Sequence, residues 1–106
     1  MAIKITVLYP DKPGARFDLA YYLDIHIPLS IAKQGDKLRG LTVDIGTRGA
    51  DEGSRPPYIV SCHLLYDSLD DFKAAFFPHA RLLQADMVNY TDIETIVQVS
   101  EVRSFK

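Results

Sequence analysis

The chain has 106 residues, 47% of them hydrophobic and 25% charged, a composition that fits one globular domain over residues 1–106. Its net charge at neutral pH is −2 and its twelve basic residues are scattered, so no nucleic-acid partner is expected, because phosphate binding requires clustered Lys and Arg. No window holds the ~20 apolar residues of a membrane span and the first residues lack a signal-peptide pattern, so we expect a cytoplasmic location and no membrane partner.

Neither a metal nor a cofactor is expected from the motifs. Cys62 is the only cysteine, which excludes a disulfide within the chain and a cysteine-based zinc site, and its apolar neighbours predict a buried thiol. The three histidines lack His-x-His or His-x₃-His spacing. No glycine-rich loop leads into a helix with a Lys-Ser/Thr ending. We therefore predict no metal and no cofactor.

The first half of the chain predicts a strand, a helix and a second strand. Residues 2–9 alternate between apolar and polar side chains, and the cluster Pro10–Gly14 ends this strand. From Phe17 to about Gln34 the apolar residues recur at steps of four, which indicates a helix. Pro28 cannot donate to the carbonyl of Asp24, so we expect this helix to kink or restart there. Residues 41–45 alternate again as a strand.

The second half predicts a loop, a strand, a broken helix and a last strand. Residues 46–57 hold three glycines and two prolines and indicate a long mobile loop. Residues 58–66 alternate strictly, and Ser68 is the expected N-cap of a helix that Pro78 interrupts. Residues 89–92 are expected to form a loop, and residues 94–105 a long final strand.

The predicted order of β-α-β-β-α-β is typical of the ferredoxin-like α+β fold, with a four-stranded antiparallel sheet and two kinked helices on one face. The other face then mixes polar with apolar side chains and is too apolar to remain fully hydrated. We therefore expect a homodimer formed through this sheet face. The side chains assigned to it are Thr6, Ile59, Ser61, His63, Leu65, Ile96, Gln98, Ser100 and Val102.

His26 is the first candidate for chemistry. It follows Tyr22 by one helical turn, Asp24 by two residues, and stands just before Pro28. Imidazole gives and takes protons near neutral pH, so His26 with Tyr22 as hydrogen-bond partner fits a general acid or base. The alternative is a histidine that caps carbonyls freed at a helix break. For His63 we favour a position at the dimer interface over one lining a cavity.

The later segment from Asp86 to Asp92, with Asn89 and Tyr90, is the other polar group. From the residues alone, the favoured interpretation is a turn in which Asn89 and Asp92 bond their own backbone.

These residues resemble a known family. The pattern Phe-x₃-Tyr-x₄-His-x-Pro-Leu from Phe17 to Leu29, followed by Pro78 and the segment from Asp86 to Asp92, resembles the EthD family, named for ethyl tert-butyl ether degradation. That family belongs to the dimeric α+β-barrel superfamily, and the resemblance covers nearly the whole chain except residues 46–57. It implies a pocket between helices and sheet. The implied catalytic residues are His26, Tyr22 and Asp24, and the implied ligand-binding residues are Asp86, Asn89 and Tyr90.

Two functional hypotheses follow from the resemblance. The first is cofactor-independent proton transfer on a small apolar or aromatic compound of catabolism or biosynthesis, of the cyclase, decarboxylase or isomerase kind, with His26 as acid or base. The second is a non-catalytic ligand-binding or accessory protein of an oxidative degradation pathway. Superfamily relatives differ in their reactions, so fold alone does not decide between them.

Overall fold

A computed structural model describes all 106 residues. The predicted element order is confirmed, and the sheet is antiparallel throughout with strand order β2-β3-β1-β4. The strands are β1 (Ile3–Pro10), β2 (Gly40–Ile45), β3 (Tyr58–Tyr66) and β4 (Ile96–Glu101). The helices are α1 (Leu19–Tyr21), a π-helical turn (Tyr22–His26), α2 (Ile27–Gln34), α3 (Leu69–Phe76) and α4 (Ala80–Asp86), with 3₁₀ turns at Gly35–Lys37, Phe77–His79 and Met87–Asn89.

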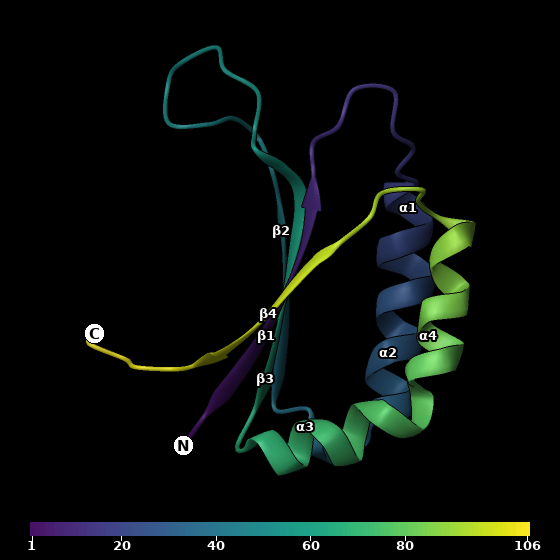
Figure 1. The fold of residues 1–106 in the computed structure, drawn as a ribbon, viewed down its shortest axis with the longest axis vertical. Coiled ribbons are helices and arrows are strands. Elements are labelled where there is room, and N and C mark those ends of the chain that lie inside the picture. Colours follow the sequence, from purple (N-terminus) through teal and green to yellow (C-terminus); the bar gives the residue numbers. More distant parts are fainter.

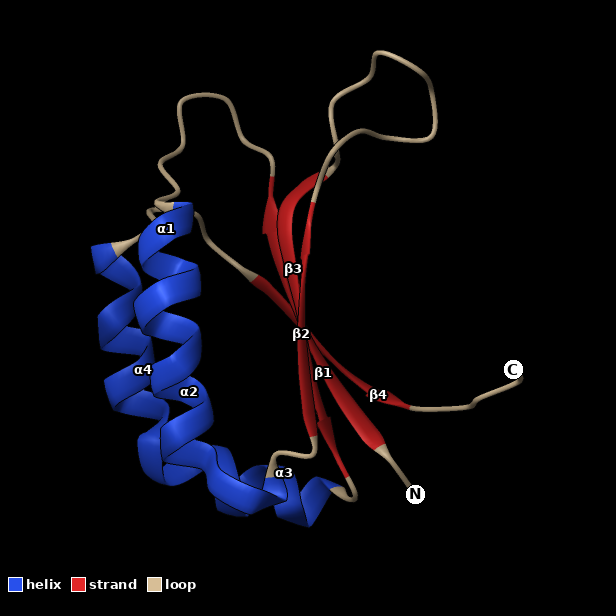
Figure 2. Cartoon of the chain, turned by 180° about the vertical axis from the view of Figure 1, so that it is seen from behind, coloured by secondary structure: helices blue, strands red, loops and turns tan.

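Both helical segments cover the same face of the sheet, as the ferredoxin-like α+β fold requires. The first helix, from α1 through the π-helical turn to α2, runs side by side with α4, while α3 lies across one end of the pair (Figures 1 and 2). The opposite face of the sheet carries no helix. No helix has both the length and the apolar character needed to cross a membrane.

The first helix begins two residues later than predicted and passes through Pro28 without ending. Asp18 caps it by accepting a hydrogen bond from the Tyr21 N–H at 3.1 Å, and Phe17 instead forms an isolated β-bridge with Thr91. The interruption expected at Pro28 takes the form of the π-helical turn that precedes it. There the Ile27 N–H bonds a carbonyl five residues earlier, and the extra residue accommodates the proline.

The second helix starts and breaks where the sequence predicts. Ser68 is its N-cap and accepts a hydrogen bond from the Asp71 N–H at 3.1 Å. Pro78 lies in the 3₁₀ turn Phe77–His79, where the chain changes direction between α3 and α4.

The strand register places the predicted polar residues in one row. Thr6 of the central strand β1 lies opposite His63 on one side and Gln98 on the other. The predicted final strand over 94–105 is too long, because β4 spans Ile96–Glu101 only. It pairs with residues 3–8 of β1, and beyond Val102 no strand remains for it to pair with.

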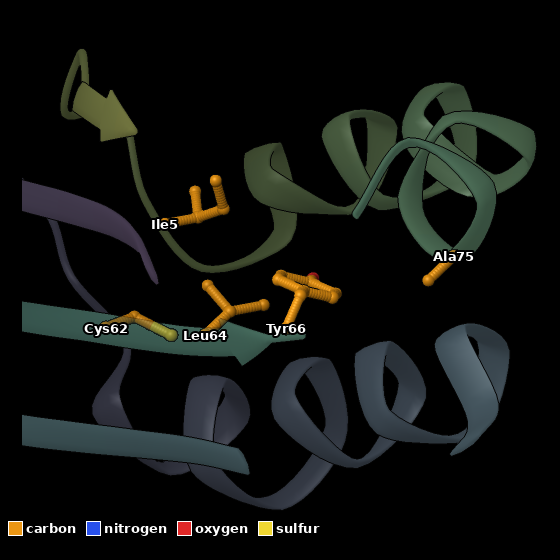
Figure 3. Packing of buried hydrophobic residues seen from close by; sticks show 5 residues of the cluster. All are labelled: Ile5, Cys62, Leu64, Tyr66 and Ala75. Atoms are coloured by element: carbon orange, nitrogen blue, oxygen red, sulfur yellow. The ribbon is translucent and has the colours of Figure 1, made fainter. Parts of the chain in front are cut away.

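The core lies between sheet and helices. One cluster contains Ile5, Cys62, Leu64 and Tyr66 from the sheet and Ala75 from α3 (Figure 3). The predicted burial of Cys62 is confirmed, since the residue is 4% exposed. A second, mainly aromatic cluster fills the other end, with Tyr9, Tyr22, Val60, Tyr90 and Ile93 as its buried members.

Candidate functional site

A cavity of about 140 Å³ lies between the first helix, α4 and the sheet. Eleven of its fifteen lining residues are hydrophobic, and none is Lys, Arg, Asp or Glu. An apolar cavity of about 150 Å³ suffices to bind benzene. The lining residues are Val7, Tyr9, Tyr22, His26, Ile27, Ser30, Cys62, Leu64, Phe76, Leu83, Gln84, Met87, Tyr90, Thr95 and Val97.

His26 is the residue in this wall best suited to proton transfer. It ends the π-helical turn, is 9% exposed, and its Nδ1 lies 2.8 Å from Oδ2 of Asp86. Its Nε2 has no hydrogen-bond partner in the protein and is not fully enclosed. Because His26 lines the cavity, we infer that Nε2 is the ring nitrogen available to a bound molecule. The imidazole ring therefore lies between the Asp86 carboxylate, which is outside the cavity lining, and any molecule bound in the cavity.

Asp86 is held by three hydrogen-bond donors. Oδ1 accepts from the Tyr21 hydroxyl at 2.7 Å and from Nδ2 of Asn89 at 3.0 Å, while Oδ2 accepts from His26. Burial alone would raise the pKa of the carboxyl, but the hydrogen bonds from Tyr21, His26 and Asn89 outweigh it and lower the pKa below its ordinary value. Asp86 is therefore a carboxylate at neutral pH.

The ionised Asp86 determines the tautomer of His26. A carboxylate can only accept, so Nδ1 must carry the hydrogen and donate it. In the neutral imidazole, Nε2 then presents a lone pair to the cavity. If Nε2 takes up a proton, the adjacent carboxylate stabilises the resulting cation. The pair is therefore arranged to accept a proton from a bound molecule and to return it.

Tyrosine rings form the wall around His26. Tyr22 stacks on the imidazole with ring centroids 5.7 Å apart, and Tyr90 lies 4.7 Å from it. The hydroxyls of Tyr9 and Tyr90 are hydrogen-bonded at 2.8 Å. Burial is the main cause that raises the pKa of Tyr9, Tyr22 and Tyr90, and it raises that of the Cys62 thiol to about 11. All four groups therefore remain neutral at physiological pH.

The structure brings together four of the six residues singled out from the sequence. His26, Asp86, Asn89 and Tyr90 form one connected group, with Asp86 and Asn89 behind the imidazole and outside the cavity lining. Tyr22 lines the cavity, but the predicted hydrogen bond to His26 is wrong, because the two rings stack.

Asp24 lies on the exposed side of the helix and has no hydrogen bond to His26. The catalytic role that the resemblance implies for Asp24 stays a prediction, and the carboxylate that contacts His26 is that of Asp86. Residues two apart on a helix point in different directions, which explains why Asp24 does not contact His26.

Tyr21, Gln34 and Tyr66 are polar residues near the site that sequence reasoning missed. Tyr21 is bound to Asp86, and Tyr66 donates to Gln34, which in turn donates to Ser30. A partial signal was present, because Tyr22, His26, Ser30 and Gln34 follow one another at steps of four.

The segment after Asp86 is hydrogen-bonded to the residues that precede the first helix. The Tyr90 carbonyl accepts from the Asp18 N–H at 2.7 Å, and Asp92 accepts from the Arg16 N–H at 2.8 Å. The predicted turn with Asp92 bonded to its own backbone is therefore wrong, since its partner lies near the start of the first helix. His63 is on the helix-free sheet face, between Thr6 and Asp44.

The fold and site define a ferredoxin-like α+β protein with a small cavity backed by a histidine–carboxylate pair. Residues 15–94 match the model of the EthD domain, and the chain belongs to the EthD family. An EthD-like protein from Ralstonia eutropha JMP134 is 39% identical with a TM-score of 0.93, over 99% of this chain and 95% of the other.

More distant structures share the fold alone. A dimeric ferredoxin-like protein of unknown function from Thermobifida fusca YX is 14% identical, with a TM-score of 0.58 over 96% of this chain and 92% of the other. SnoaB, a cofactor-independent oxygenase from Streptomyces nogalater, is 14% identical in a mutant form, with a TM-score of 0.56 over 98% and 94%. A search of curated proteins gave no match.

Proposed function

We propose that this EthD family member binds a small apolar or aromatic molecule in the cavity and moves a proton on it through His26, without a cofactor. The observation that carries the proposal is the position of His26, whose Nε2 opens on the cavity while Nδ1 is held by Asp86 at 2.8 Å. The volume of about 140 Å³ suits a single six-membered ring with few substituents.

The reaction class that fits this arrangement is proton abstraction and return. Nε2 takes a proton from an acidic C–H or O–H of the ligand, and Asp86 stabilises the imidazolium ion. The proton then returns to the same atom or to another, which amounts to exchange or isomerisation. A positioned general base of this kind contributes typically 10²- to 10⁴-fold to a rate. The likeness to SnoaB is a likeness of fold and supports only the compatibility of this fold with cofactor-independent chemistry.

A second candidate function is non-catalytic binding of the same class of molecule, as an accessory protein. The observation that favours it is the lack of a second proton-transfer group, because the raised pKa of Tyr9, Tyr22 and Tyr90 makes these hydroxyls weak acids as well as keeping them from acting as bases. A reaction that needs a separate acid and base at once is therefore poorly served. Binding without turnover needs only the apolar wall and one polar anchor.

One experiment tests both candidates. Melting temperatures are measured with a panel of phenols and enolisable ketones, and every stabilising compound is followed by NMR in D₂O for exchange of its C–H protons. His26→Gln is compared with His79→Gln, which changes a histidine in the turn between α3 and α4. Catalysis predicts that only His26→Gln abolishes exchange. Binding without exchange favours the accessory function, and a panel in which no compound stabilises the protein rejects both.

We also infer that the chain assembles as a homodimer through the helix-free sheet face. The support is the apolar content of that face, where Ile59, Leu65 and Val102 are only half-buried and Ile96 is 50% exposed. The structural neighbour from Thermobifida fusca is described as dimeric. Covering this face with a second copy removes apolar surface from water.

A further inference from the structure

A chain of buried hydrogen bonds leads from the core to the cavity. Tyr66 is fully buried, and its hydroxyl donates to Oε1 of Gln34. Nε2 of Gln34 donates to Oγ of Ser30 at 2.9 Å. Gln34 and Ser30 are 5% and 6% exposed, and Ser30 is the member of the chain that lines the cavity.

The direction of these hydrogen bonds is fixed at the buried end. The hydroxyl proton of Tyr66 needs an acceptor, and Oε1 of Gln34 supplies it. The amide nitrogen must then face Ser30, so the serine oxygen is an acceptor. The only hydrogen bond of this oxygen comes from Gln34, which leaves the serine hydroxyl proton free to be donated into the cavity.

Ser30 stands one helical turn beyond His26 on the same face. Residues four apart on a helix have Cβ atoms about 5–6 Å from each other. The cavity therefore presents an acceptor, Nε2 of His26, and a donor, the Ser30 hydroxyl, on one wall. No charged side chain lies in the lining to hold an ionic group.

We propose that Ser30 is a specificity-determining residue and that the ligand is a single-ring compound with two oxygen substituents. One hydroxyl of the ligand donates to Nε2 of His26, and the second oxygen accepts from Ser30. Dihydric phenols, hydroxy-carbonyl aromatics and enolised cyclic diketones belong to this class. The inference rests on the proposed function, because it assumes that a small ring occupies the cavity beside His26.

The chemical logic is the cost of an unpaired buried donor. A ligand with one oxygen satisfies Nε2 of His26 but displaces water from Ser30 without replacing its hydrogen bond. A ligand with a second oxygen at the right spacing satisfies both. A net hydrogen bond of ordinary strength strengthens binding by about threefold to tenfold.

The test measures calorimetric dissociation constants of phenol, catechol, resorcinol and hydroquinone for the whole chain. The three dihydroxybenzenes have the same size and differ only in oxygen spacing. We expect one isomer to bind about threefold to tenfold more tightly than phenol. Ser30→Ala should erase this advantage and bind phenol at least as tightly as the wild type does, because no serine donor is then left unpaired. Ser61→Ala, on the helix-free sheet face, should preserve the advantage.

A ligand-side comparison makes the test independent of the folding of Ser30→Ala. The aminophenol with the geometry of the best isomer has a nitrogen that accepts hydrogen bonds poorly, so it should bind wild-type protein no more tightly than phenol. If phenol binds but no isomer gains, or if the gain survives Ser30→Ala or the exchange of oxygen for nitrogen, the role of Ser30 is refuted. If none of the compounds binds, the proposed function itself fails.

Discussion

Replacing Asp86 by Asn should destabilise the protein in a pH-dependent way. The substitution keeps the shape but removes the charge that accepts hydrogen bonds from Tyr21, His26 and Asn89. A hydrogen bond to a charged group contributes about 1.5–3 kcal/mol and a neutral one about 0.5–1.5 kcal/mol, so weakening these three hydrogen bonds costs about 2 kcal/mol or more. The Asp86 side chain is only 12% exposed, so solvent screening reduces this value little.

The pH dependence follows from the lowered pKa of Asp86. A carboxyl whose pKa is lower in the folded than in the unfolded protein stabilises the fold above its unfolded pKa and loses this contribution as the pH falls. The difference in free energy of unfolding between wild type and Asp86→Asn should therefore be largest at neutral pH and should decrease as the pH falls below about 4. At pH 7 it corresponds to a drop in melting temperature of about 8 °C or more.

The assay is urea unfolding followed by circular dichroism at several pH values. Asp24→Asn is the matched control, because it makes the same chemical change on the same protein at an exposed residue close to His26. Asp24→Asn should change the free energy of unfolding by less than about 0.5 kcal/mol. Equal effects of the two variants at pH 7, or an Asp86→Asn effect that stays constant down to pH 3, would refute the reasoning.

Three further predictions concern other parts of the molecule. Tyr21→Phe should lower the free energy of unfolding in urea, and the loss should largely disappear when Asp86→Asn is already present, because the hydroxyl and the carboxylate form one hydrogen bond. Cys62, whose pKa burial raises to about 11, should react slowly with a disulfide reagent at pH 8 in the folded protein and quickly in urea; equal rates would contradict its burial. Leu65→Lys should convert the proposed dimer to an 11.9 kDa monomer in light scattering, whereas Ile31→Lys on the exposed side of α2 should not, and a wild-type monomer would overturn the dimer.

The order of elements was predictable from the sequence because it depends on local patterns. The strict alternation of residues 58–66 reappears as alternating burial along β3, and Ser68 caps α3 as its position before two acidic residues suggests. The length of β4 was not predictable, because it depends on where β1 begins and ends as a pairing partner. The length of a paired strand depends on both partners, and the residue pattern of one strand gives no information about where its partner ends.

The site was predictable in its members but not in its contacts. His26 and Asp86 were both recognisable as candidates, yet they are sixty residues apart, and only the packing of α4 beside the first helix brings them within 2.8 Å. Asp24 is close to His26 in sequence, yet it lies on the exposed side of the helix. Nothing local indicates that Tyr21 contributes a third group to the same carboxylate.

The π-helical turn explains how one helix supplies so much of the cavity wall. Residues four apart on a regular α-helix advance by slightly more than one full turn, so a row at steps of four drifts around the axis. Tyr22, His26, Ser30 and Gln34 are nevertheless all buried on one side. The wider turn at Tyr22–His26 rotates less per residue and offsets the drift. Pro28 is the second residue of α2 and cannot donate the hydrogen bond to the Asp24 carbonyl that a regular α-helix would require, which disfavours regular α-helical pairing across the turn. The proline thus acts on the site indirectly, by keeping the imidazole and the serine hydroxyl in one line along the cavity.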